Sequence, residues 1–251
     1  MIDQLSIDLS NYCSKQCSFC YNHSSKKGNV AWSAEEVIAF AKDCIANGVK
    51  AVSLGGGEPF EYDGIFDIID ALYPLCYLTV TTNGLHFGSN RGVLWKTLEL
   101  HKPDKIHISL HNPESLELSM VLQESRMLQN LGIKPGCNLL VSKTKLEDCA
   151  LAYESLSNVL NPDQIILVPL RFGDTPSPED LAHVTGGKPF QSPSCLLKCQ
   201  PPVKFVSVSW DKKVNYCSYA GGKQPLQSLD FQGLVDALDK VQFKSCTRHE
   251  N

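Results

Sequence analysis

Short apolar runs alternate with amphipathic stretches over the first two thirds of the chain. The apolar runs predict six strands, at 5–10, 49–55, 77–82, 105–111, 137–142 and 164–170. Between them, apolar positions at helical spacing predict helices from Ser33 to about Asn47 and over 62–72, 90–100, 114–131 and 144–160. Such regular alternation of strand and helix favours a parallel sheet with helical crossovers, whose chemistry gathers at the carboxyl ends of the strands.

The pattern changes after Gly173. Residues 174–203 are rich in Pro, Ser and Gly and predict a linker or wrapped loop. Next comes KFVSVSW-DKK-VNYCS, which predicts a β-hairpin with its turn at 211–213, and then an amphipathic helix at about 230–241. We therefore expect a core domain at 1–173 and an extension at 174–251.

Composition and charge narrow the class of protein. The chain has 43% hydrophobic and 20% charged residues with a net charge of −4, which is typical of a globular protein with a full core. This charge favours neither a nucleic-acid partner nor an anionic membrane surface. The N-terminal MIDQLSIDLSN lacks a signal-peptide pattern, and no apolar run has membrane-spanning length. We expect a cytoplasmic protein.

Eleven cysteines stand out in this composition. In a reducing compartment they favour metal ligation over structural disulfides. Three of them crowd into NYCSKQCSFCYNH, between the first predicted strand and the first predicted helix, as Cys13, Cys17 and Cys20. These thiolates can converge on one soft metal centre. Zinc would need a fourth ligand, for which His23 is available, whereas an iron–sulfur cluster on three thiolates leaves one iron open.

The C-x3-C-x2-C spacing, with Phe19 just before the third cysteine, resembles the signature of the radical S-adenosylmethionine (radical SAM) superfamily. The second predicted strand ends in Gly56-Gly57-Glu58-Pro59, which is similar to the family's Gly-Gly-Glu motif for the amino group of SAM. Taken alone, a glycine-rich turn before proline is more often just a turn. By the same resemblance, further SAM contacts are expected at the ends of the third, fourth and sixth strands, at Asn83, Ser109 and Leu170, and on the fifth strand at Asn138.

The resemblance implies a partial (β/α)6 TIM-like barrel in an α/β fold. It implies a 4Fe–4S cluster on Cys13, Cys17 and Cys20, with SAM bound at the open iron. It also implies reductive cleavage of SAM to a 5′-deoxyadenosyl radical, hydrogen abstraction from a substrate, and a reducing protein such as flavodoxin or ferredoxin. Strand parity places His107, Ser109 and His111 on one face of the fourth strand, where His111 is either a substrate-side acid or base or a structural histidine.

The last quarter of the chain supplies Cys195, Cys199, Cys217 and Cys246 around the predicted hairpin. This arrangement resembles the twitch or SPASM extensions of the family, which carry an auxiliary iron–sulfur cluster. A full SPASM segment has more cysteines, so we expect one auxiliary cluster at most, and buried or zinc-bound cysteines remain an alternative. Such a cluster would accept an electron from a substrate radical and favour a net oxidation, as in an oxidoreductase.

Two functions from different classes follow. The first is a radical SAM enzyme acting on a small molecule or a peptide. The second is a non-catalytic iron–sulfur or zinc protein for electron transfer or structural binding. Gly56, Gly57 and Glu58 favour the enzyme, because a cluster carrier has no use for an amine-binding strand end.

Overall fold

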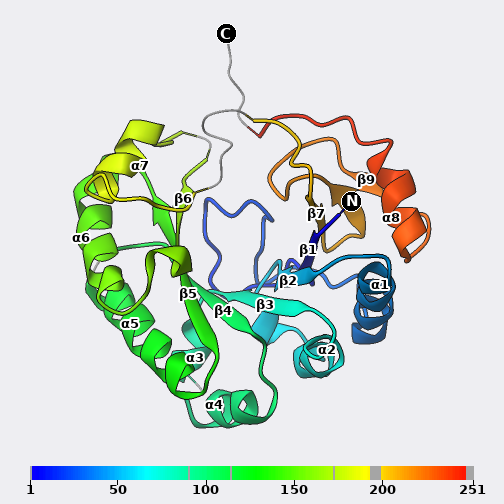
Figure 1. The fold of residues 1–251 in the computed structure, drawn as a ribbon, viewed down its shortest axis with the longest axis horizontal. Helices are drawn as coiled ribbons and strands as arrows, with labels where there is room; N and C mark the ends of the chain where they lie inside the picture. Colours follow the sequence, from blue (N-terminus) through cyan, green and yellow to red (C-terminus); the bar gives the residue numbers. More distant parts are fainter. Residues whose placement is uncertain (1, 90, 114, 172, 193–198, 247–251) are drawn as a thin grey trace. The chain divides into compact units, whose positions relative to one another are not determined.

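The computed structural model describes residues 2–89, 91–113, 115–171, 173–192 and 199–246. The chain divides into two compact units. Unit 1 comprises residues 1–82, 100–104 and 201–246, and unit 2 comprises residues 83–99, 105–200 and 247–251. The chain order alternates strand and helix from β1 to β6 (Figure 1), as the apolar pattern predicts. The proposed boundary between a core and an extension at 173/174 stays a prediction.

Unit 1 is a sheet with strand order β3-β2-β1-β7-β8-β9. Parallel pairing joins β3, β2, β1 and β7, whereas β8 and β9 run antiparallel to their neighbours. The strands are β1 (Gln4–Asp8), β2 (Ala51–Gly55), β3 (Tyr77–Thr82), β7 (Phe205–Val208), β8 (Lys213–Asn215) and β9 (Gln224–Pro225). The helices are α1 (Ala34–Ala46), α2 (Ile65–Leu72) and α8 (Phe231–Leu238), with a 3-10 turn η1 (Pro59–Glu61).

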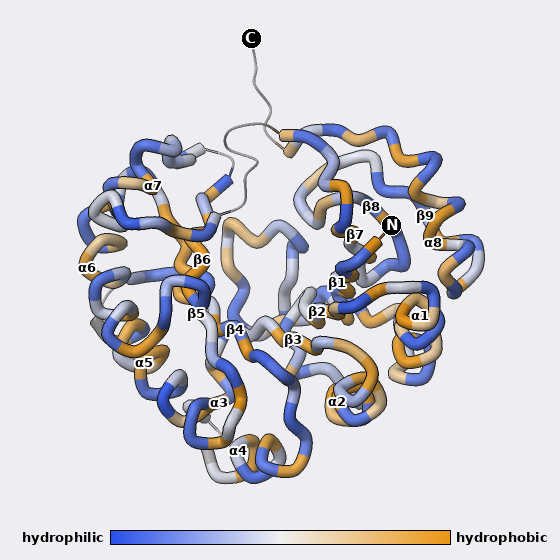
Figure 2. Tube along the Cα trace, in the orientation of Figure 1, coloured by the Kyte–Doolittle hydropathy of each residue, from blue (hydrophilic) through white to orange (hydrophobic). Residues whose placement is uncertain are grey.

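Unit 2 holds three parallel strands in the order β6-β5-β4. They are β4 (Lys105–Leu110), β5 (Lys134–Val141) and β6 (Ile165–Pro169). The helices are α3 (Leu85–Ser89), α4 (Arg91–Leu100, whose last residue belongs to unit 1), α5 (Ser115–Asn130), α6 (Leu146–Ser157) and α7 (Pro178–Val184), with 3-10 turns η2 (Lys143–Lys145) and η3 (Pro162–Gln164). Residues along α1 and α6 alternate between hydrophobic and hydrophilic (Figure 2), because one face of each helix is buried.

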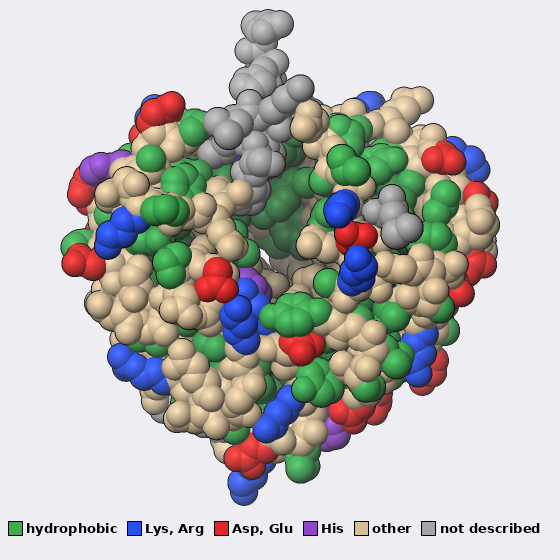
Figure 3. Space-filling view, viewed as in Figure 1, with side chains coloured by type: hydrophobic (Ala, Val, Ile, Leu, Met, Phe, Trp, Pro, Cys, Tyr) green, Lys and Arg blue, Asp and Glu red, His purple; other side chains and the backbone are tan. Residues whose placement is uncertain are grey.

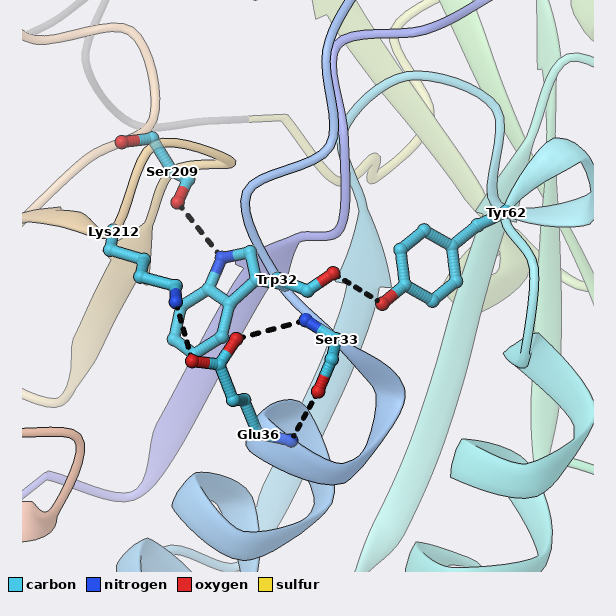
Figure 4. Close-up of polar contacts among 6 residues, drawn as sticks. All are labelled: Trp32, Ser33, Glu36, Tyr62, Ser209 and Lys212. Atoms are coloured by element: carbon cyan, nitrogen blue, oxygen red, sulfur yellow. Dashed lines mark hydrogen bonds and ion pairs between the residues drawn. The ribbon is translucent and has the colours of Figure 1, made fainter.

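The β7–β8 hairpin is fixed to the start of α1 (Figure 4). The Trp32 indole N–H donates to the Ser209 carbonyl at 3.3 Å, and the Lys212 ammonium lies 2.7 Å from Glu36 Oε1. Glu36 also closes the Ser33 capping box that begins the helix. The predicted hairpin and the predicted helix start are therefore both confirmed, and the structure joins them.

Two sequence expectations are wrong in detail. The interval 174–203, expected to be a linker or loop, contains α7, because Ser177 caps Asp180 and Pro178 occupies the first turn. The fifth strand begins at Lys134 and not at 137, so it includes Pro135 and Gly136, which lay outside the predicted strand. In both places a residue typical of loops stands near the start of a regular element. Pro178 lies in the first turn of α7, and Pro135 and Gly136 lie near the start of β5.

No helix among the described residues combines the length and apolarity needed to cross a membrane. On the face drawn in Figure 3, acidic and basic side chains are interspersed, and the coloured residues show no broad patch of one sign.

Candidate active site

The three cysteines occupy the loop that follows β1 in unit 1. Cys13 is buried, while Cys17 and Cys20 are half-buried. The Cys20 amide donates to the Cys17 carbonyl at 3.2 Å, and the His23 amide donates to the Cys20 carbonyl at 3.1 Å. Two successive turns therefore fold the loop back on itself, and His23 reaches the left-handed region at φ 50°. His23 is exposed.

Hydrogen bonds hold this loop at both ends. The Cys13 amide donates to the Ser25 carbonyl at 3.1 Å, and the Ser14 amide donates to the Glu61 carboxylate at 2.9 Å. Within the loop, the buried Asn22 side chain donates to the Ser10 carbonyl at 2.9 Å. The backbone that carries the thiols is thus fixed by contacts from 10–25 and from η1.

The Gly-Gly-Glu segment after β2 lies directly against the start of this loop. The Gly57 amide donates to the Ser10 carbonyl at 2.7 Å, and the Glu58 amide donates to the Tyr12 carbonyl at 2.9 Å. A Cβ atom on Gly57 would lie 1.9 Å from the Tyr12 carbonyl oxygen, and Gly56 has a φ of +106°. Only glycine fits this close backbone approach. The structure therefore brings the predicted SAM-amine motif to the cysteine loop.

Glu58 is almost fully buried, with 1% of its surface exposed. Its Oε1 accepts the Thr82 hydroxyl at 2.7 Å and the Phe60 amide at 3.2 Å. Two donors fix this carboxylate at the ends of β2 and β3 and offset part of its desolvation. Thr82 therefore has a positioning role that the sequence did not assign to it.

A second buried carboxylate, Asp8, ends β1 in the same unit. It accepts the Tyr21 hydroxyl at 3.0 Å, and burial raises the pKa of Asp8 to about 6. The Tyr21 ring packs on Tyr219, with centroids 4.7 Å apart. This cluster was not predicted from the sequence. The one signal in the sequence was an acidic residue within an apolar strand.

Two of the four C-terminal cysteines lie in neighbouring segments. An isolated antiparallel bridge joins Gly221 to Lys244, with amide–carbonyl distances of 2.9 and 3.2 Å. Cys217, which is half-buried, and the buried Cys246 flank this bridge. Cys199 belongs to unit 2, and Cys195 lies outside the described residues. The bridge supports proximity for Cys217 and Cys246.

Within the described residues, no group of three or more His, Cys, Asp or Glu side chains converges tightly enough to hold a single metal ion. The zinc alternative for the three-cysteine loop and His23 stays a prediction.

The predicted SAM contacts of unit 2 lie near the carboxyl ends of β4 and β6, in the interior of β5 and just after β3. Ser109 on β4 and Asn138 on β5 are register partners on one face, and both are half-buried. Leu170 follows β6, where its amide donates to the Val141 carbonyl at 2.8 Å. Asn83 follows β3, and its side-chain oxygen accepts the Leu85 amide at 2.8 Å, which is a turn-forming role.

Comparison with known proteins decides the domain type. Residues 7–129 match the family model described as the radical SAM superfamily. The chain contains a radical SAM domain. This domain confirms the family resemblance of the three-cysteine loop and supports an enzyme that binds SAM and a 4Fe–4S cluster, as the superfamily implies.

Two relatives of the radical SAM chain are cyclases. The GTP 3′,8-cyclase of Clostridium perfringens (strain SM101 / Type A) is 24% identical over 243 residues, which cover 86% of this chain and 73% of that protein. The probable GTP 3′,8-cyclase of Methanocella arvoryzae is 28% identical over 122 residues, which cover 49% of this chain and only 38% of that protein.

Two solved structures share the fold. Streptococcus suis SuiB bound to S-adenosylmethionine superposes with a TM-score of 0.69 at 17% identity, covering 86% of this chain and 60% of SuiB. The structure of anSMEcpe with bound AdoMet gives a TM-score of 0.68 at 14% identity, covering 97% and 83%. These neighbours are partial TIM barrels, so the predicted fold class is confirmed. The chain spans less than two thirds of SuiB and of the Methanocella protein.

Proposed function

We propose that this radical SAM protein cleaves SAM reductively and abstracts a hydrogen atom from a small-molecule or peptide substrate. The observation that carries the proposal is the close approach of Gly57 to the cysteine loop, where the Tyr12 carbonyl fills the space of a side chain. This contact joins a three-thiolate donor set to a strand end suited to an amino group. A non-catalytic cluster protein would not require it.

The residues present fit a 4Fe–4S cluster and SAM. Cys13, Cys17 and Cys20 would supply three thiolates, which leaves one coordination position for a ligand with amino and carboxylate groups. When both groups are bound, one electron from the reduced cluster breaks a sulfonium carbon–sulfur bond, giving methionine and a 5′-deoxyadenosyl radical that removes the substrate hydrogen.

The remaining steps belong to the protein. The backbone of Gly56 and Gly57 and the Glu58 carboxylate would hold the ammonium group of SAM, because carbonyls and a carboxylate are its natural acceptors. Thr82 keeps that carboxylate in place. The proposal assigns Ser109 and Asn138 to polar SAM contacts, Asn83 and Leu170 to further SAM contacts, and Phe19 to cofactor binding in the cysteine loop.

The substrate class and the auxiliary cluster belong to the same proposal. The two relatives named as GTP 3′,8-cyclases support a small molecule. SuiB has been solved with its precursor peptide SuiA, which supports a peptide. We assign the auxiliary cluster to Cys217 and Cys246 together with Cys199 and Cys195. A net oxidation would return an electron to it, while a reducing protein such as flavodoxin or ferredoxin in the cytoplasm would supply the first electron.

The direct test is anaerobic reconstitution with iron and sulfide, followed by dithionite and SAM, with 5′-deoxyadenosine measured by chromatography. We expect production by the wild type and its loss, by at least about 100-fold, in Cys13→Ala, Cys17→Ala and Cys20→Ala. Cys76→Ala is the control, because this half-buried thiol lies in the turn before β3. A wild type that binds zinc, shows no cluster absorbance and forms no 5′-deoxyadenosine would refute the proposal.

Iron and sulfide counts test the auxiliary cluster separately. We expect the reconstituted wild type to hold about eight irons if the second cluster is also a cubane, and Cys217→Ala to hold about four. Equal iron contents in the two proteins would remove the auxiliary cluster and leave the SAM-site proposal intact.

A further inference from the structure

One face of β4 and β5 in unit 2 is polar and buried at the amino ends of the strands. Lys105 and His107 are only 8% and 9% exposed, and strand alternation places both on the face that also carries Ser109. The opposite face of β4 carries Ile106 and Ile108, which are fully buried. Lysine is rarely this buried unless an opposite charge accompanies it.

Lys105 has no such partner among the described residues. Its register partner on β5 is another lysine, Lys134. The carboxylate nearest to this pair, Asp163, forms an ion pair with Lys134 at 2.9 Å and is itself exposed. Burial, together with Lys134, lowers the pKa of Lys105. The local charge is therefore unbalanced by one cation.

The side chain of His107 also lacks a partner for one of its polar atoms. Its Nδ1 is buried and has no hydrogen-bond partner among the described residues. Burial and the nearby Lys105 lower the pKa of His107 to about 4, while a side-chain hydrogen bond with Asn138 acts in the opposite direction. An unsatisfied ring nitrogen beside an unpaired ammonium is costly for the free protein.

Gly136 on β5 makes room for both side chains. A Cβ atom at this position would lie 2.8 Å from His107 Nδ1 and 2.8 Å from Lys105 Cε. The ends of the two side chains therefore meet over one glycine, which is the register partner of His107. The sequence places a small residue where the two donors converge.

We propose that Lys105 and His107 bind an anionic group, a phosphate or a carboxylate, carried by the substrate. An anion would neutralise the Lys105 ammonium, and its negative charge would favour protonation of His107, whose Nδ1–H would then donate a hydrogen bond to it. One ligand would thus supply a partner to both side chains. Assigning the anion to the substrate rests on the proposed function, whereas the anion site itself does not.

The position on the strand suits that assignment. His107 and Lys105 precede Ser109, a predicted SAM contact, by two and four residues on the same face of β4, rises of about 7 Å and about 13 Å. A small molecule or an extended peptide segment can span this distance, with its anionic group at His107 and Lys105 and another part of it beside Ser109. The site therefore favours an anionic substrate over a neutral or cationic one.

The test measures the midpoint temperature of thermal unfolding of the reconstituted full chain. Inorganic phosphate, or separately acetate, replaces chloride at constant ionic strength. We expect the midpoint of the wild type to rise with anion concentration, and the apparent dissociation constant to rise at least about tenfold in Lys105→Met and in His107→Asn. Lys204→Met is the matched control, because this exposed lysine of unit 1 is already paired with Asp3 at 3.1 Å, and it should respond like the wild type. A larger response to phosphate than to acetate assigns the ligand as a phosphate, and the reverse as a carboxylate.

A second signature concerns the free protein. Because Lys105 is buried without a counter-charge, Lys105→Met should raise the midpoint in chloride while abolishing the anion response. Equal anion responses in the wild type and Lys105→Met would overturn the proposal, since the effect would then be general salt action on the surface. Measuring 5′-deoxyadenosine in the same samples keeps the two proposals apart, because a failed anion site leaves SAM cleavage unchanged.

Discussion

The two units treat buried polar groups differently. In the described part of unit 1, no buried side-chain nitrogen or oxygen lacks a hydrogen-bond partner. Glu58 has Thr82, and Asp8 has Tyr21. In unit 2, Trp95 Nε1, His107 Nδ1 and Ser125 Oγ are buried without partners. The cysteine-bearing unit is thus complete in itself, whereas the other unit carries donors that a ligand could satisfy.

Under the proposals above, this difference separates the positioning of the cluster and of the amino group of SAM in unit 1 from recognition of an anionic substrate group in unit 2. A cluster and that amino group would need a fixed backbone, which unit 1 provides through main-chain contacts of Gly57 and Glu58. A substrate site can leave polar groups unsatisfied until the ligand arrives, because the binding free energy then includes relief of that cost.

The largest expected effect is the loss of SAM cleavage in Gly57→Ala of unit 1, compared with the small effect of Gly136→Ala in unit 2. In Gly57→Ala the new methyl group meets the Tyr12 backbone at 1.9 Å, and main chain cannot move aside without displacing the cysteine loop. In Gly136→Ala it meets the ends of the His107 and Lys105 side chains at 2.8 Å, which can rotate away. We expect 5′-deoxyadenosine formation to fall at least about 100-fold in Gly57→Ala and less than about threefold in Gly136→Ala.

Gly92→Ala is the control for this pair, since nothing lies within 4 Å of a Cβ atom in its place on α4. It should keep full activity and gain about 0.5–1 kcal/mol of stability. If Gly57→Ala retained wild-type SAM cleavage and cluster content, the fixed backbone of unit 1 would not be what positions the cofactor.

The next effect concerns the free energy of unfolding, which should depend on pH in opposite directions through Asp8 and through His107. Asp8 has its pKa raised to about 6 by burial, so between pH 4 and 6 the folded state binds more protons and stability falls as pH rises. His107 has its pKa lowered to about 4, so over a similar window the unfolded state binds more protons and stability rises with pH. Each dependence amounts to roughly 3 kcal/mol at full extent.

Denaturant unfolding at pH 4.5 and at pH 6.5, in buffer free of phosphate and carboxylates, measures both effects. Relative to the wild type, Asp8→Asn should gain stability on going to the higher pH, and His107→Asn should lose it. Shifts of the same sign in the two variants would contradict the contrast between the units.

The sequence predicted the strand–helix order because apolar periodicity reports which face of an element is buried. It also placed Cys13, Cys17, Cys20 and Gly57 in one candidate site, because their motifs are local, and the structure brings the two segments together. It missed α7, where the capping pattern of Ser177 was outweighed by its Pro-rich surroundings. It did not single out Lys105 either, because parity gives the face of a residue and says nothing about a missing counter-charge.

Contacts between residues far apart in the chain set a second limit on what the sequence alone can predict. Tyr21 and Tyr219 pack ring on ring, yet nearly two hundred positions separate them in the chain. No local pattern connects them, and the same is true of Trp32 and Ser209. These contacts follow from the pairing of β1 with β7, which only the folded chain shows.

A smaller effect is expected at Thr82. Thr82→Val keeps the shape of the side chain but removes the hydroxyl that donates to Glu58 at 2.7 Å. Glu58 Oε1 then keeps the Phe60 amide as a donor, and the carboxylate is held less firmly. We expect the KM for SAM to rise about tenfold, with kcat changed less than about threefold, and Thr82→Ser to restore the wild-type value. An unchanged KM would show that Glu58 is positioned without this hydroxyl.

The smallest effect compares one ion pair from each unit. The Lys212 ammonium lies 2.7 Å from Glu36 and 5.2 Å from the Trp32 ring centroid, and the paired side chains are 26% and 39% exposed (Figure 4). Lys134 pairs with Asp163 at 2.9 Å, but both side chains are about half exposed, at 45% and 53%. Since a partly buried pair with an aromatic neighbour is screened less, Lys212→Met should cost about 1 kcal/mol of unfolding free energy and Lys134→Met less than about 0.5 kcal/mol.

Denaturant curves at low and high salt check this, because about 1 M salt should shrink the Lys212 effect toward that of Lys134. Equal costs for the two variants at low salt would mean that the buried Trp32 contact alone holds the hairpin to α1. The Lys212–Glu36 ion pair would then add nothing to the stability of unit 1.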